Sequence, residues 1–160
     1  MASKKKPTDE PRYIAQNRRA RFDYHVVQTW EAGMVLCGTE VKSCRDGHAS
    51  LKEAWARVVD GEIFVVGMHI SPYAKGTVGA HDETRQRKLL LHAQEIRKIA
   101  REVEGEGRTL VPLALYWKKH LVKCRLALVT GKHKADKRAD VSKREAERDI
   151  KRIMKERNQR

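Results

Sequence analysis

The chain has 160 residues and a formal net charge of +14, with 35 Lys and Arg against 21 Asp and Glu. Residues 1–21 carry +5 and residues 131–160 carry +6, which leaves only +3 for the 109 residues between them. Basic ends on a nearly balanced body are typical of proteins that bind nucleic acid, because neutralised phosphates release counterions. No apolar run is long enough to span a bilayer, and the N-terminus lacks the apolar stretch of a secretory signal. We therefore expect one cytoplasmic domain with charged ends and no membrane partner.

Sequence patterns of enzymes and metal sites are missing. The chain has no glycine-rich phosphate loop after a predicted strand, no G-x-S-x-G and no H-E-x-x-H. Cys37, Cys44 and Cys124 are odd in number and lack C-x-x-C spacing, which indicates reduced thiols rather than disulfides or a zinc site. His69 and His81 could be acid–base groups, but single histidines in a basic chain more often contact phosphate. We expect no catalysis, no cofactor and no metal.

The first half of the body is predicted from local patterns, in chain order. Residues 1–12 are polar and predict a flexible arm. Residues 14–23 then predict a short basic helical turn. The rest of this half is assigned as follows: a strand at 24–30, a strand at 34–42 bent at Gly38, one or two helical turns at 49–54, a hairpin of 55–59 with 62–66 around Asp60-Gly61, and a loop at 71–82.

The second half contains the best predicted helix. Apolar residues Ile96, Ile99, Ala100 and Val103 recur at helical spacing within residues 92–103, and two glycines follow. Two more strands are predicted, at 109–118 and 121–129. Pro112 should cause a bulge or an edge in the first of them, and the second alternates between an apolar face and a partly basic face.

These elements favour a mainly β protein with a few helices. Short consecutive strands predict antiparallel pairing, and about six of them suit a small barrel of the oligonucleotide-binding (OB) type. The predicted organisation is an arm at 1–12, a barrel at 13–130 and a basic tail at 131–160.

The tail has too little apolar surface to fold alone, but it contains helical signals. Ser142 to Glu145 fits a capping box, and Ala146, Ile150, Ile153 and Met154 form one narrow apolar stripe. We expect a segment that is disordered when free and helical when bound to a large anionic partner. The alternative is a solvated tail that only keeps the protein soluble.

Basic residues cluster at predicted strand ends and loops, where they could converge on one RNA-binding face. The clusters are Asn17 to Arg21, Lys42 with Arg45, Arg85 with Arg87 and Lys88, and Lys118 to His120. The alternative is a scatter of solubility charges. Glu31 and Glu40 could accept a base amino group or orient an arginine, or they could be structural ion pairs.

Several motifs, taken together and in order, resemble the SmpB family of bacterial transfer-messenger-RNA-binding proteins, from about residue 13 to the end. They are Ile14-Ala-Gln-Asn-Arg-Arg-Ala-Arg, Glu31-Ala-Gly, Gly38-Thr-Glu-Val-Lys-Ser, His69-Ile-Ser-Pro-Tyr, Arg87-Lys-Leu-Leu-Leu-His92, Leu115-Tyr-Trp-Lys118 and Asp136-Lys-Arg138.

The resemblance implies an OB-type barrel that grips the tRNA-like domain of transfer-messenger RNA and delivers it to stalled ribosomes. The tail would fold as a helix in the empty messenger channel near the decoding centre, and the nascent chain would be tagged for degradation. Alanyl-tRNA synthetase and elongation factor Tu would be partners only through the RNA. An RNA-modifying enzyme and a structural ribosomal protein are the competing classes.

The predicted site residues form two sets. The resemblance implies Asn17, Glu31, Lys42, Lys88, Leu90, Lys118 and Asp136 to Arg138, and the basic clusters and the tail pattern supply the others. The RNA-binding set is Asn17, Arg18, Arg19, Arg21, Glu31, Lys42, Lys88, Leu90, His92 and Lys118. The ribosome-binding tail set is Lys132, His133, Lys134, Asp136, Lys137, Arg138, Arg144, Ile153, Met154 and Lys155. The chain departs from the family pattern at Ala135, where an aromatic residue or histidine is usual, and at Cys44, where leucine is usual. His133 could supply the stacking contact that Ala135 lacks, and Cys44 should keep the apolar role.

Overall fold

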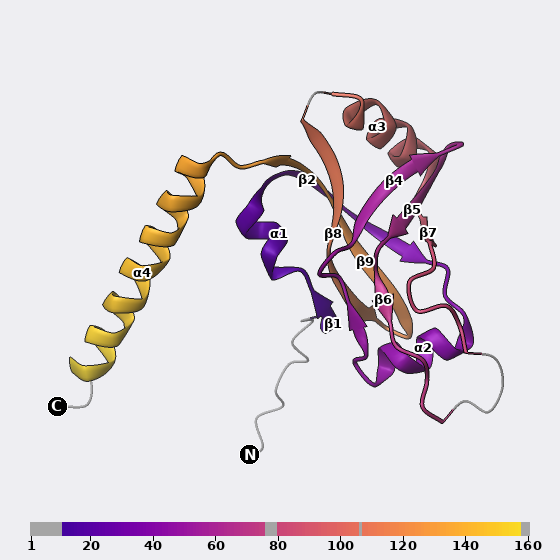
Figure 1. Ribbon diagram of the computed structural model, residues 1–160, viewed down its shortest axis with the longest axis horizontal. Coiled ribbons are helices and arrows are strands. Elements are labelled where there is room, and N and C mark those ends of the chain that lie inside the picture. The colour runs from indigo at the N-terminus through magenta and orange to yellow at the C-terminus, as the bar shows by residue number, and fades with distance from the viewer. Residues whose placement is uncertain (1–10, 76–79, 106, 158–160) are drawn as a thin grey trace, which may run out of the picture.

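A computed structural model describes residues 11–75, 80–105 and 107–157, and the arm predicted at 1–12 lies outside it up to residue 10 (Figure 1). The elements are β1 (Arg12–Gln16), α1 (Arg18–Asp23), β2 (Tyr24–Met34), α2 (Gly38–Arg45), β3 (Ala49–Ser50), β4 (Trp55–Val59), β5 (Glu62–Val66), β6 (His69–Ile70), β7 (Arg87–Leu90), α3 (Ala93–Val103), β8 (Arg108–Lys118), β9 (Leu121–Gly131) and α4 (Lys134–Arg157).

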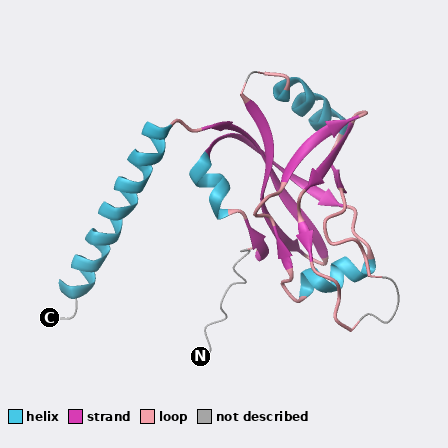
Figure 2. Cartoon of the chain, in the orientation of Figure 1, coloured by secondary structure: helices cyan, strands magenta, loops and turns pink. Residues whose placement is uncertain are grey.

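The strand bonding of the body is antiparallel and ring-like. Within the described residues, seven strands form a sheet in the order β1-β8-β4-β5-β7-β2-β9, and β9 also pairs with β8. Hydrogen bonding therefore runs from β8 through β4, β5, β7, β2 and β9 back to β8. β4 pairs with β8 at Leu110, and β1 pairs with it further along, at residues 114–117. The short strands β3 and β6 pair separately. Figure 2 shows the strands gathered in one body, from which α4 stands apart.

The main core is formed by apolar side chains from the strands of this ring together with residues of α2 and α3. On β9, Val122, Cys124, Leu126 and Leu128 are buried, which confirms the predicted apolar face. The predicted hairpin is confirmed as β4 and β5, and the predicted helix as α3, whose Ile99 is fully buried. The register of β8 shifts between Pro112 and Ala114, which is the bulge expected at that proline.

A second apolar cluster lies under α1. Ala20 on α1 packs with Val111 and Leu113 of β8 and with Ala127 and Val129 of β9. These side chains lie outside the main core, so α1 covers part of β8 and β9 and is fixed to the body.

Three local predictions in the first half are wrong. Residues 14–16 belong to β1, which pairs with β8, rather than to the helical turn predicted at 14–23. Residues 38–45 form α2 rather than the end of a strand, because the Glu40 carboxylate accepts a hydrogen bond from the Cys37 N–H at 2.7 Å and caps a helix there. Residues 49–54 contain β3 and a turn rather than helical turns, because β3 pairs with β6 and Leu51 is buried in the core.

The tail is a continuous helix, α4, and none of its side chains from Lys134 to Arg157 is buried. The helix begins before Ser142, so the predicted capping box is wrong, and the His133 N–H donates instead to Asp136 at 3.2 Å. Contacts with α1 and opposite charges four residues apart, such as Asp140 with Arg144, support the helix where core packing does not.

No helix in the described part of the chain is long and apolar enough to cross a membrane.

Candidate nucleic-acid interface

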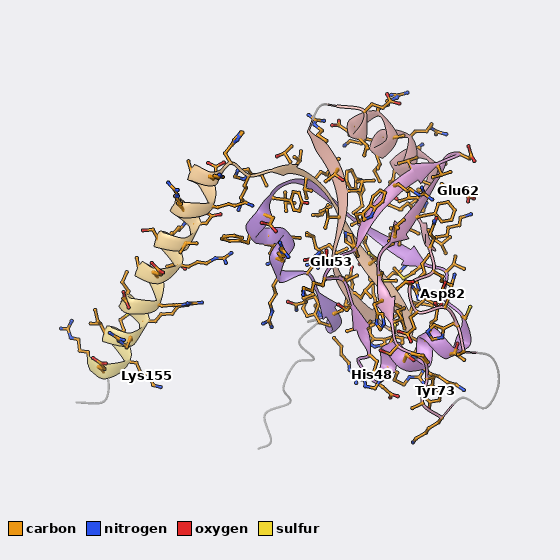
Figure 3. All side chains as sticks on the ribbon, viewed as in Figure 1. His48, Glu53, Glu62, Tyr73, Asp82 and Lys155 are labelled. Atoms are coloured by element: carbon orange, nitrogen blue, oxygen red, sulfur yellow. The ribbon has the colours of Figure 1, made fainter. Side chains whose placement is uncertain are left out.

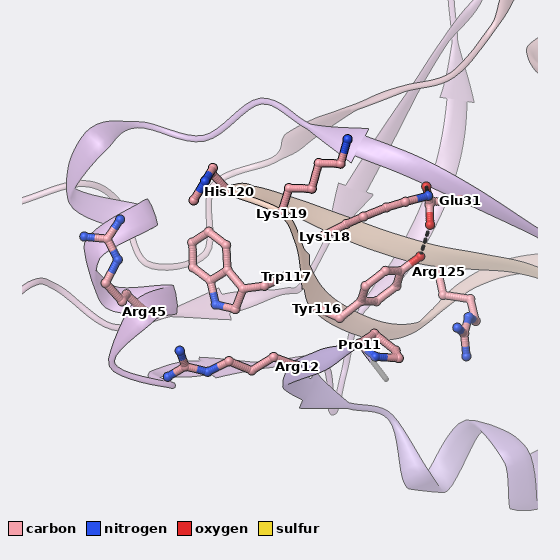
Figure 4. Close-up of a pocket in the computed structure, with 10 residues that line it drawn as sticks. All are labelled: Pro11, Arg12, Glu31, Arg45, Tyr116, Trp117, Lys118, Lys119, His120 and Arg125. Atoms are coloured by element: carbon pink, nitrogen blue, oxygen red, sulfur yellow. Dashed lines mark hydrogen bonds and ion pairs between the residues drawn. The ribbon is translucent and has the colours of Figure 1, made fainter. Parts of the chain in front are cut away.

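An open cavity of about 750 Å³ lies beside the turn that joins β8 to β9 (Figure 4). Its walls carry many positive charges, one carboxylate and two aromatic rings, from residues Pro11, Arg12, Glu31, Arg45, Tyr116, Trp117, Lys118, Lys119, His120 and Arg125. We call this cavity the basic hollow. Cations that neutralise phosphates, combined with rings on which bases can stack, are the features of a single-stranded nucleic-acid site.

Glu31 organises the wall of the basic hollow. Its carboxylate accepts hydrogen bonds from Tyr116 Oη at 2.7 Å and from Lys118 Nζ at 2.7 Å. The bond from Lys118, followed by that from Tyr116, holds the pKa of Glu31 below its usual range. Burial and then the bond to Glu31 raise the pKa of Tyr116 to about 12. At neutral pH Glu31 is therefore an ionised carboxylate that accepts hydrogen bonds from both the Tyr116 phenol and Lys118.

Each of the two aromatic rings is also in cation–π contact with an arginine. The Arg125 guanidinium lies 5.4 Å from the centroid of the Tyr116 ring, and that of Arg45 lies 6.0 Å from the centroid of Trp117. Tyr13 meets Tyr116 edge to face, with centroids 6.2 Å apart. Tyr116 is only 4% exposed, so its ring supports the wall from inside, whereas the Trp117 ring is half-buried and remains partly accessible.

A smaller apolar pocket of about 240 Å³ continues from the basic hollow, since His120 lines both. Gly33 of β2 pairs with Leu90 of β7 and with Lys123 of β9. Leu90 is 51% exposed and Leu121 is 63% exposed. A Cβ at Gly33 would lie 3.3 Å from the Cβ of Leu90, so glycine lets that leucine lie over β2. The structure therefore brings Leu90 to the same side of the molecule as Glu31 and Lys118.

Other residues of the predicted RNA-binding set lie elsewhere. Asn17 is buried as the cap of α1: its Oδ1 accepts from the Ala20 N–H at 3.0 Å, and its Nδ2 donates to the Leu51 carbonyl at 3.1 Å. These bonds turn its amide inward. Arg19 pairs with Asp23 at 3.1 Å, whereas Arg18 and Arg21 line a hollow of about 340 Å³ that also includes Arg144 of α4.

The last three members of that set are separate from the basic hollow. Lys42 lies on α2 with its Nζ 5.5 Å from the centroid of Tyr73. Lys88 pairs with Glu62 on β5, and His92 is the exposed N-cap of α3. The tail set lies on α4 and just before it, and Ile153 and Met154 are 61% and 62% exposed.

Glu40 forms a structural ion pair, which is one of the two roles that the sequence analysis left open for it. It is fully buried with Arg87, whose Nε donates to its Oε1 at 2.9 Å, and Arg85 Nε donates to the same oxygen at 2.9 Å. Arg87 also donates to the backbone carbonyls of Met68 and Glu83 at 2.8 and 3.0 Å. Burial alone would raise the pKa of Glu40, but the bond from Arg85, with those from Cys37 and Arg87, lowers it.

The basic cluster predicted at Arg85 to Lys88 is therefore mostly internal. Arg87 is fully buried, and the Arg85 side chain is directed to Glu40. This network ties α2 to the segment before β7, and it fixes the helix that carries Lys42 and Arg45.

Arg45, Lys119 and His120 belong to the basic clusters that were predicted to converge, and they do line the basic hollow. Its other residues were missed by sequence reasoning: Arg12, Tyr116, Trp117 and Arg125. Aromatic residues next to lysines in Leu115-Tyr-Trp-Lys118 were the available signal for the turn. Arg12 was assigned to the flexible arm, and only the pairing of β1 with β8 brings it to the site.

The ring of strands and the basic hollow with aromatic walls define an RNA-binding class of protein. The sequence model of the SmpB protein family matches residues 14–156. An SsrA-binding protein of Acetivibrio thermocellus is 52% identical over 148 residues, covering 92% of this chain and 96% of that protein. Another, from Thermobifida fusca, is 48% identical over 159 residues, covering 98% and 99%. The chain belongs to the SmpB family.

A solved structure supports the same relationship. It is described as "tmRNA-SmpB: a journey to the center of the bacterial ribosome" and is 45% identical, with a TM-score of 0.63 over 74% of this chain and 84% of that chain.

Proposed function

We propose that this chain is the RNA-binding adaptor of trans-translation: it binds transfer-messenger RNA (SsrA RNA) and acts with it on stalled ribosomes. The relatives named above are SsrA-binding proteins, and they match over nearly their whole length. The observation that carries the proposal is the basic hollow, in which Glu31, Lys118 and two aromatic rings form a shaped cationic surface. The protein has no chemistry of its own and works in the cytoplasm.

The strand ring is an OB-type barrel in this proposal, and residues 13–130 form the RNA-binding domain. The closed bonding path from β8 back to β8 supports this interpretation. The tRNA-like domain of transfer-messenger RNA lies against the basic hollow and the neighbouring Leu90 surface. Its phosphates meet Lys118 and its neighbours, and an unstacked base meets the accessible part of the Trp117 ring.

Residues 131–160 form the ribosome-binding tail. In this proposal α4 enters the empty messenger channel, where its cations meet ribosomal RNA phosphates. The motif Asp136-Lys137-Arg138 makes the contact near the decoding centre, and the exposed Ile153 and Met154 contact the channel further along. Alanyl-tRNA synthetase and elongation factor Tu are reached through the RNA.

The test is a binding titration with transfer-messenger RNA and, separately, with an elongator tRNA at about 50 mM and about 200 mM salt. A shaped site predicts that the preference for transfer-messenger RNA persists at the higher salt, because contacts fixed by Glu31 do not depend only on counterion release. Equal affinities that fall together with salt would contradict the proposal and leave only unspecific binding by basic segments.

A further inference from the structure

Two hairpin turns of the body place a residue other than glycine at positive φ. Among the described residues these are Asp60, with φ +50°, and Lys119, with φ +56°. Each is the first residue of the two-residue turn of its hairpin, β4–β5 or β8–β9. Turns of this length match the twist of the strands when their first residue has positive φ, so the hairpins themselves require this conformation.

The residue types at the two turns differ in how well they suit positive φ. Asp60 is followed by Gly61, and this pair is favoured in such turns because both residues tolerate the conformation. A lysine at positive φ has its Cβ close to the following carbonyl oxygen, and its side chain offers no local hydrogen bond in return. The β8–β9 turn is therefore strained at Lys119. Strain of this kind is concentrated at functional sites, where the residue is needed for another reason.

The Lys119 side chain makes no contact within the body that would explain a lysine at this position. The residue is exposed, and in the described part of the chain its ammonium group has no hydrogen bond, ion pair or cation–π contact. By contrast, Lys118 pairs with Glu31 at 2.7 Å. Lys119 lines the basic hollow, where Figure 4 shows its extended side chain. It therefore brings to the hollow a charge that no carboxylate of the protein neutralises.

The tip of the β8–β9 hairpin is a suitable place for a phosphate contact. Lys119 lies beyond the last paired residues of the two strands, so an RNA backbone can approach its ammonium group from outside the sheet. The partly accessible ring of Trp117 lies two residues before it on β8. Sites for single-stranded RNA combine a ring on which a base stacks with cations that follow the neighbouring phosphates.

We propose that Lys119 binds an RNA phosphate at the basic hollow, and that the β8–β9 turn keeps a strained lysine for this contact at the expense of stability. The inference rests on the proposed function and adds a phosphate-binding residue to it. It predicts that a glycine at this position improves the fold and weakens RNA binding.

Three variants of Lys119 separate its charge from its backbone conformation. Lys119→Gly removes both the charge and the strain, Lys119→Gln removes only the charge, and Lys119→Arg keeps both. In thermal unfolding, Lys119→Gly should raise Tm by about 2–4 °C, because relief of the strain exceeds the chain entropy that glycine adds to the unfolded state. The other two variants should stay within about 1 °C of the parent protein.

RNA binding should follow the charge rather than the stability. At about 0.1 M salt, we expect the Kd for transfer-messenger RNA to rise about fivefold in both Lys119→Gly and Lys119→Gln, and by about twofold at most in Lys119→Arg. Titrations by fluorescence anisotropy between about 50 and about 200 mM salt give the slope of log Kd against log salt concentration. That slope should decrease by about one in the two uncharged variants, since one phosphate contact is lost.

Two control variants lie outside the basic hollow. Lys98→Gln removes an exposed lysine of α3 and should change the Kd by about twofold at most. Asp60→Lys places a lysine at the equivalent position of the β4–β5 turn. The tip of that hairpin, next to Glu62 in Figure 3, lies well apart from the β8–β9 turn. Asp60→Lys should therefore lower Tm without changing the Kd by more than about twofold.

The possible outcomes bear on separate parts of the proposal. An unchanged Kd for Lys119→Gly, or an equal loss of affinity in Lys98→Gln, would overturn the phosphate contact. A Tm for Lys119→Gly no higher than that of the parent would overturn the strain in the turn. Absence of transfer-messenger-RNA binding by the unmodified protein would refute the proposed function and leave the Tm result standing.

Discussion

Two carboxylates, Glu31 and Glu40, lie among cations in this chain, and their surroundings differ. Glu31 is at the surface, in the wall of the basic hollow, and it holds Lys118 and Tyr116. Glu40 is fully buried and joins Arg85 and Arg87. The first should therefore affect RNA binding and the second the stability of the fold.

Replacing Glu31 with Ala should weaken RNA binding although it makes the protein more positive. Without the carboxylate, Lys118 and Tyr116 lose the group that orients them, and we expect the Kd for transfer-messenger RNA to rise about tenfold, roughly 1.4 kcal/mol. Fluorescence anisotropy at fixed salt would measure it. Tighter binding would show that Glu31 only repels the RNA. Glu104→Gln, which removes an exposed carboxylate at the C-cap of α3, controls for net charge.

Replacing Glu40 with Gln should destabilise the fold strongly. The change leaves Arg87 buried without its counter-charge, which typically costs about 3–5 kcal/mol. Urea unfolding would measure the free energy of unfolding. Glu62→Gln breaks the pair with Lys88, in which both side chains are about two-fifths exposed, and should cost less than about 1 kcal/mol. Similar losses for the two variants would contradict a special role for the buried network.

The same network should make stability depend on pH in acid. The pKa of Glu40 is lower in the folded protein than its ordinary value of 4.5. Its contribution is therefore complete above pH 4.5 and is lost as the pH falls through the lower, folded value. Unfolding curves between neutral pH and pH 3 should show this loss in the parent protein and less of it in Glu40→Gln.

At the scale of elements, the turn after β5 depends on one glycine. Gly67 has φ +72°, and a Cβ there would lie 2.5 Å from the Glu53 carbonyl oxygen. Gly67→Ala therefore combines an unfavourable backbone conformation with a clash against backbone, and we expect a loss of about 2–5 kcal/mol.

Gly47 is the matched control for Gly67. It has φ +80° but no atom within 4 Å of an added Cβ, so Gly47→Ala should cost only the backbone strain of about 1–2 kcal/mol. Thermal or urea unfolding of the two variants compares them directly. A loss at Gly67 no larger than that at Gly47 would mean that the segment around Glu53 moves away at little cost.

At the scale of the whole molecule, the charge divides the chain into a body and a tail. Deleting residues 132–160 keeps β9 complete and removes α4 and its flanking residues, which together carry a charge of +6. We expect the affinity for transfer-messenger RNA to stay within about threefold, since the basic hollow remains and only counterion release by the tail is lost. Tagging on stalled ribosomes should be abolished. A parallel loss of RNA binding and tagging would contradict this division.

The sequence alone determined the elements whose signals are local. The alternation on β9, the turn of the β4–β5 hairpin and the helical spacing of α3 are encoded within about a dozen residues each, because strand and helix periods appear in short windows. The ordered motifs from Ile14 to Arg138 likewise identified the SmpB family. Glu31, Leu90 and Lys118 could be selected by resemblance, and the structure brings them to one side of the body.

Only the tertiary structure decided the features that join distant parts of the chain. The pairing of β1 with β8 brings Arg12 to the basic hollow. Arg87 donates a hydrogen bond to the buried Glu40, which is 47 residues away in the sequence. This pair stabilises α2, where a strand was predicted. Lys137 reaches Asp23 across 114 residues and joins the first part of α4 to the body. Such contacts depend on which residues the fold brings together, and no short window of sequence contains that information.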